Sequence, residues 1–208
     1  MTLMNLGYYK IEYHTFYKPV KTEAIMDKKL LRYLILGVIF TFLGGTLLHF
    51  TYEWSGNNFW VGLFSPVNES SWEHMKLLFF PMLLYHLVSC ILFRRTPSAP
   101  DESILTYLRN NYPCICLGNA LGILIGTISI PVFFYTYSGI LGTHFLFLDI
   151  AIFLCSAILG FACTYWTAQK CQVRKYAGLI YSALALLALC FFVFTVFPPD
   201  LGIFTSVS

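Results

Sequence analysis

Long apolar blocks separated by short polar segments dominate this chain. An α-helix needs about 20 apolar residues to cross the roughly 30 Å hydrocarbon core of a bilayer. Five blocks are candidates for such spans; the second, residues 77–93, is short by itself, so its helix is expected to begin within the preceding polar stretch. The pattern predicts an all-α membrane protein, a five-transmembrane-helix bundle. The expected spans are residues 30–50, 68–93, 114–137, 141–166 and 176–197.

Composition supports this fold class. Hydrophobic residues make up 58% of the 208 positions and charged residues only 11%, against roughly 25% charged in soluble domains. A water-soluble domain could not bury that much apolar surface. We therefore expect residues 29–208 to form one transmembrane domain, with no separate soluble domain.

Basic residues lie in every second segment between the expected spans, and the other segments carry only Lys76. Cytoplasmic loops of membrane proteins are enriched in Lys and Arg. We therefore expect a multi-pass protein of the cell membrane with a cytoplasmic N-terminus and an extracytoplasmic C-terminus. The orienting residues are Lys10, Lys18, Lys21, Lys28, Lys29, Arg32, Arg94, Arg95, Arg109, Lys170, Arg174 and Lys175.

The first 28 residues are polar and aromatic, without helical periodicity, and are expected to form a cytoplasmic tail. The segment from Met26 to Leu30 reads like a short basic leader into the first span. Met26 is therefore an alternative start of the natural chain.

Ionisable side chains are costly at membrane depth, so each one is a candidate for function. The expected topology gathers most of them near the outer leaflet. Asp149 stands out because it is expected about two turns into an apolar helix, where it would need a partner such as Lys76 or a histidine. The group comprises His49, Glu53, Glu69, Glu73, His74, Lys76, His144 and Asp149.

Helical phase divides this polar group. At about 100° per residue, Glu69, Glu73 and Lys76 share one arc of the second span, whereas His74 lies about 100° from Glu73. His74 is therefore the less favoured metal ligand. The candidates are Glu69, Glu73, Lys76 and Asp149 for catalysis, and His49, Glu53 and His144, with His74 behind them, for metal binding.

A structural explanation competes with the functional one. Asn68 could cap the second helix, and acidic residues in its first turn would complement the positive helix end. Trp54, Trp60 and Trp72 are expected to form an interfacial aromatic belt.

Seven cysteines, mostly within apolar blocks, argue against a disulfide framework. Cys114 and Cys116 with Cys171 could form a soft metal clip. Membrane helices also use cysteine as a small apolar residue, so both interpretations stay open.

The segment PVNESSWEHMKL, from Pro66 to Leu77, carries a resemblance. It resembles an uncharacterised family of small bacterial membrane proteins with the core P-V-N-E-S-x-W-E-H-x-K-L. The later Leu148-Asp149-Ile150 and Phe197-Pro198-Pro199 are also similar to that family. The resemblance implies a membrane location and no particular activity.

Three functions remain open. The polar cluster predicts a metal-dependent membrane hydrolase or lipid-modifying enzyme, with a divalent metal such as zinc as cofactor. An ion-coupled transporter would use Glu69, Glu73 and Asp149 as ion sites. A noncatalytic membrane subunit or scaffold would use the evenly spaced Gly118, Gly122 and Gly126 for helix contact.

The partners expected from the sequence follow from the bilayer location. They are the lipid bilayer itself and either a lipid substrate or a membrane partner protein. Nucleic acid is excluded, because the basic residues flank apolar spans instead of forming a patch of their own.

Overall fold

A computed structural model describes residues 28–95, 108 and 111–206. It has five helices long and apolar enough to cross a membrane, the architecture of a multi-pass membrane protein, and no strand within these residues. The expected all-α, five-span fold is confirmed. The long helices are α1 (Lys28–Trp54), α3 (Ser71–Arg95), α5 (Tyr112–Leu141), α6 (Leu146–Lys170) and α7 (Ala177–Val196); the short elements are α2 (Phe59–Gly62), η1 (Gln172–Tyr176) and η2 (Gly202–Phe204).

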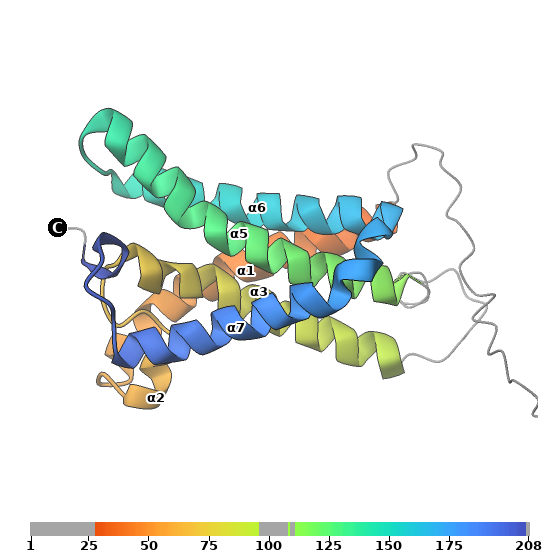
Figure 1. Cartoon of the computed structure of the whole chain (residues 1–208), viewed down its shortest axis with the longest axis horizontal. Helices are drawn as coiled ribbons and strands as arrows, with labels where there is room; N and C mark the ends of the chain where they lie inside the picture. The colour runs from red at the N-terminus through yellow and green to blue at the C-terminus, as the bar shows by residue number, and fades with distance from the viewer. Residues whose placement is uncertain (1–27, 96–107, 109–110, 207–208) are drawn as a thin grey trace, which may run out of the picture.

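Residues 1–27, with most of the expected tail and the alternative start at Met26, lie outside the described residues. Within the bundle, α5 packs against α6, α3 and α7, while α1 packs against α3 and α6. Helix α2, the α5–α6 turn and η2 lie at one end, here the α2 end (Figure 1). The opposite end, which carries η1, is the η1 end.

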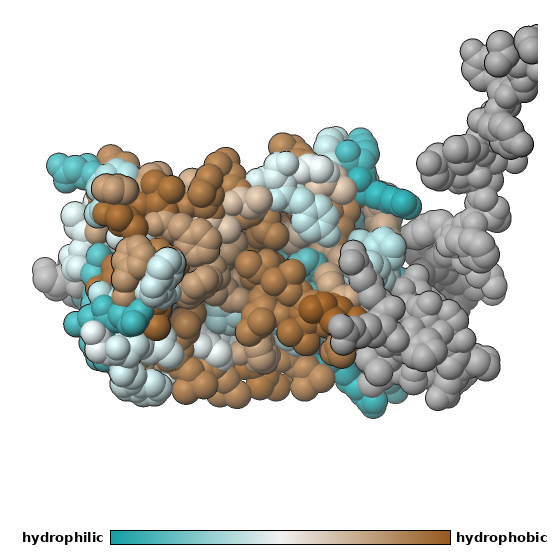
Figure 2. Space-filling model, turned by 90° about the horizontal axis from the view of Figure 1, so that it is seen from below, coloured by the Kyte–Doolittle hydropathy of each residue, from teal (hydrophilic) through white to brown (hydrophobic). Residues whose placement is uncertain are grey.

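On the face drawn in Figure 2, hydrophobic residues cover most of the middle of the molecule and hydrophilic residues gather toward its two ends. Large apolar side chains are well exposed on the long helices, such as Leu36 at 61% on α1 and Leu179 at 70% on α7. Such an apolar surface is stable against lipid and not against water.

The contact between α5 and α6 depends on small residues. Gly118, Gly122 and Gly126 face α6, and a Cβ atom on Gly122 would lie 2.3 Å from the carbonyl oxygen of Gly160. Only glycine permits this approach of two backbones. The evenly spaced glycines therefore serve helix packing within this bundle.

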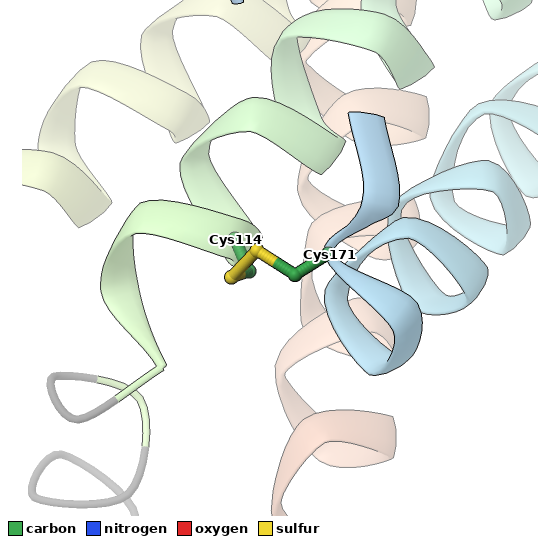
Figure 3. Close-up of a disulfide and its surroundings, with 2 residues drawn as sticks. All are labelled: Cys114 and Cys171. Carbon is green, nitrogen blue, oxygen red and sulfur yellow. A yellow bond between two sulfur atoms is a disulfide. The ribbon is translucent and has the colours of Figure 1, made fainter. Parts of the chain in front are cut away.

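A disulfide joins Cys114, in the first turn of α5, to Cys171, the residue that ends α6 (Figure 3). The two Cα atoms are 5.3 Å apart, because α5 and α6 run antiparallel as direct neighbours. The expectation of no disulfide is wrong for this pair. The alternative of a metal clip of Cys114, Cys116 and Cys171 is also ruled out in this structure, because two of its three sulfurs are bonded to each other.

Candidate functional site: a cavity at the α2 end

The start of α3 decides which polar side chains meet. The Asn68 side chain accepts a hydrogen bond from the Ser70 N–H (2.9 Å), and the Ser70 hydroxyl accepts one from the Glu73 N–H (3.3 Å). Ser70 thus caps the helix, which begins at Ser71 and not at 68. Glu69 lies in the turn before α3, so the expected common arc of Glu69, Glu73 and Lys76 is wrong.

Glu73 and Lys76 form a buried ion pair of 2.6 Å, with side chains 3% and 0% exposed. The Lys76 ammonium also donates to the Gly62 carbonyl (3.0 Å) and the Thr195 hydroxyl (2.5 Å). The Glu73 carboxylate accepts from the Val67 N–H (3.0 Å). This network joins α2, α3 and α7, and neither charged residue lines the cavity described next.

A cavity of about 730 Å³ opens at the α2 end between α1, α3, α5 and α6. Its polar groups lie toward the end of the bundle, and its deeper wall is apolar. The size is typical of a site for a small organic ligand. The polar lining residues are Thr46, His49, Glu69, Ser71, His74, His144 and Asp149; the apolar ones include Phe42, Leu77, Ile130, Phe134, Ile152 and Phe153.

Two histidines converge on one carboxylate in this cavity. The Glu69 Oε2 atom lies 3.2 Å from His74 Nε2 and 3.8 Å from His49 Nε2. Three ligand atoms bound tetrahedrally at about 2.0 Å from a zinc ion would be about 3.3 Å apart. The Glu69–His74 separation is close to this value, the Glu69–His49 separation is about 0.5 Å longer, and all three ligand atoms lie within 4.8 Å of one another, so this group could hold a metal ion.

The hydrogen bonds of His74 support this geometry. Its Nδ1 lies 3.0 Å from the Ser70 carbonyl oxygen, which can only accept, so Nδ1 carries the proton. The other nitrogen, Nε2, then faces Glu69. Metal-binding histidines are commonly oriented in this way by a backbone carbonyl. When Nε2 is protonated as well, its hydrogen bond to Glu69 holds the pKa of the Glu69 carboxyl below its usual range, and a metal ion bound at Nε2 would displace that proton.

A second polar group lines the same cavity from the α5–α6 turn. Asp149 accepts a short hydrogen bond from the Tyr137 hydroxyl and lies 3.3 Å from His144 Nδ1. Since the carboxylate fixes the proton on Nδ1, His144 Nε2 is left as the basic nitrogen. Asp149 lies in the first turn of α6, not two turns inside it, because α6 begins at Leu146.

Glu53 lies apart from these groups. Together with His49 and Glu69 it lines a smaller pocket of about 350 Å³ beside the first, and its own side chain is exposed.

The structure thus brings five of the predicted site residues to one cavity. The sequence placed Glu69, Glu73 and Lys76 on one shared arc and His74 behind the other metal ligands. In the structure Glu69 and His74 line the cavity, whereas Glu73 and Lys76 do not. Tyr137 was missed, because nothing in an apolar block distinguishes a tyrosine that hydrogen-bonds a carboxylate from one at the membrane interface. The five cavity residues are His49, Glu69, His74, His144 and Asp149.

Trp72 was expected in the interfacial aromatic belt, but it is buried against Phe191, Phe194 and Phe204.

Comparison with known proteins yields a family and no function. No curated protein and no solved structure matches this chain. One family model matches residues 22–207, nearly the whole chain, including every residue of the cavity. The chain belongs to this family, DUF6512, a family of unknown function.

Proposed function

We propose that this protein is a metal-dependent hydrolase of the membrane that binds zinc through His49, Glu69 and His74. The observation that carries the proposal is the convergence of two histidine Nε2 atoms on one Glu69 oxygen. Two histidines and a carboxylate are the protein ligands of a well-known class of catalytic zinc site. Such a set leaves a coordination position open, and the ion supplies Lewis acidity and an activated water.

The shape of the cavity supports an amphiphilic substrate. On α1, Phe42 lies two helical turns, about 10 Å, deeper than His49. On α6, Ile152 and Phe153 continue the apolar wall beyond Asp149. A lipid ester or amide would place its polar bond among the histidines and its hydrocarbon chain against the aromatic wall.

His144 is the proposed general base. Its Nε2 would take a proton from the attacking water and return it to the leaving alcohol or amine as the acyl bond breaks. Asp149 orients the imidazole through Nδ1 and stabilises the imidazolium, and Tyr137 in turn positions Asp149. Asp149 and Tyr137 are therefore positioning residues.

The cavity is proposed to open at the outer leaflet. The described basic residues between the spans support this orientation, since Lys170, Arg174 and Lys175 all lie at the η1 end. By the positive-inside rule, the α2 end would then face outward. The Cys114–Cys171 disulfide at the η1 end counts against this orientation, because disulfides are rare on the cytoplasmic side.

Hydrolysis of a fluorogenic acyl-ester phospholipid in mixed micelles tests the proposal. The purified full chain should cleave the probe when loaded with zinc and lose the activity after chelation. His144→Gln should lower kcat by about 100-fold or more, while Glu53→Gln should retain activity, because Glu53 lies outside the main cavity. Zinc-loaded protein that cleaves neither ester nor amide lipids, or that moves ions across proteoliposomes without hydrolysis, would overturn the assignment.

A further inference from the structure

A second group of metal-binding side chains lies between α3 and α5, toward the η1 end. His86 and Cys90 are one turn apart on α3, and Cys116 faces them from α5. The Cys90 and Cys116 sulfurs are 3.0 Å apart, and Cys90 Sγ lies 3.7 Å from His86 Nδ1. All three ligand atoms lie within 4.8 Å of one another.

This cluster is shielded from water. His86 and Cys116 are each only 5% exposed, and Cys90 is half-buried. A buried histidine beside two thiols obtains only weak hydrogen bonds from sulfur. A metal ion would satisfy the imidazole nitrogen and both sulfurs at once.

We propose that His86, Cys90 and Cys116 bind a zinc ion that fastens α3 to α5. Two thiolates and one neutral imidazole balance the charge of a divalent ion, so the centre is neutral, as a low-dielectric environment favours. A monovalent ion such as Cu⁺ would leave a net negative charge there. Each thiol releases its proton when the ion binds.

The geometry requires little adjustment. Zinc–sulfur bonds of about 2.3 Å in a tetrahedral centre place two sulfurs about 3.8 Å apart. The sulfurs therefore need to separate by about 0.8 Å from their present 3.0 Å.

This site is separate from the cavity and from the disulfide. The disulfide joins α5 to α6, whereas the zinc ion would join α5 to α3. The inference does not depend on hydrolase activity, because its ligands share no residue with the cavity.

Cobalt substitution tests the proposal, because only thiolate ligands give an intense sulfur-to-cobalt charge-transfer band. Reduced, metal-free full chain titrated with Co²⁺ in detergent should develop this band, and Zn²⁺ should displace it. Cys90→Ser and Cys116→Ser should each abolish it. Cys155→Ser is the matched control, since Cys155 is a free, exposed cysteine of α6, and the band should persist.

His86→Ala should weaken Zn²⁺ binding by more than the roughly 10- to 100-fold that loss of an outer-shell partner costs. Three results would overturn the proposal: no charge-transfer band in a folded chain, a band that survives Cys116→Ser, or displacement by Cu⁺ with no response to Zn²⁺. A Cys90–Cys116 disulfide found by mass spectrometry in natively purified protein would also overturn it.

Discussion

Replacing Lys76 with methionine removes the ammonium from the most deeply buried ion pair among the described residues. The Glu73 carboxylate, 3% exposed, then keeps only the Val67 N–H as a partner. Loss of one member of a buried ion pair costs about 3–5 kcal/mol, because the other charge stays desolvated and uncompensated. The lost hydrogen bonds to Gly62 and Thr195 belong to the same network and are included in this figure.

The double variant Glu73→Gln with Lys76→Met separates charge from packing. Glutamine keeps an oxygen for the Val67 N–H and removes the charge, so the double variant should regain most of the lost stability. Free energies of unfolding would be measured in mixed micelles of a mild detergent and SDS. The control Lys170→Met, at an exposed position in the last turn of α6, should change stability by less than about 1 kcal/mol. A loss below about 1 kcal/mol for Lys76→Met, or a double variant no more stable than the single one, would refute the reasoning.

Three further predictions follow from the described contacts. Gly122→Val should lower the free energy of unfolding by at least about 3 kcal/mol, roughly the upper range for overpacking, because the new Cβ would meet the Gly160 carbonyl oxygen. Gly139→Ala should leave the stability nearly unchanged, because a Cβ at Gly139 would lie in open space. Cys114→Ser should lower stability by about 2–4 kcal/mol in denaturant unfolding, since the disulfide closes a long loop, whereas Cys155→Ser should leave it unchanged. The pKa of the Glu69 carboxyl in the folded chain lies below its usual value. The ionised carboxylate therefore stabilises the fold at pH values above the usual pKa, and this stability is lost as the pH falls through the lower, folded-state pKa. With metal removed by a chelator, the melting temperatures of the wild type and Glu69→Gln should differ at neutral pH and converge in acid.

The fold was largely predictable because the bilayer imposes one simple requirement on the sequence. Each span needs a long apolar block, and such a block can be recognised from the sequence even when the helix start and the orientation of its faces are assigned wrongly. Helix starts were less predictable. Asn68 and Ser70 are both good capping residues, and only the contacts with Glu73 show that Ser70 caps α3.

The candidate site was predictable in membership and not in pairing. The free-energy cost of burying ionisable groups in a membrane singled out the polar residues. However, α3 begins at Ser71, three residues later than the expected start at 68, so Glu69 lies outside the helix. Partners then depended on contacts that no local pattern encodes, such as Lys76 with Thr195 across 119 residues. The disulfide was missed for the same reason, since its cysteines are 57 residues apart.

His49, Glu69 and His74 are proposed to bind a metal ion in the cavity. The most direct measurement is the zinc content of purified full chain in which Cys90 and Cys116 are both replaced by serine, so that only the cavity site can respond. We expect about one zinc ion per chain in this background. Glu53→Gln should retain the ion, and Glu69→Gln or His74→Ala should lose it while the chain stays folded. Folded protein without zinc, or zinc retained by both Glu69→Gln and His74→Ala, would show that these residues do not bind the metal.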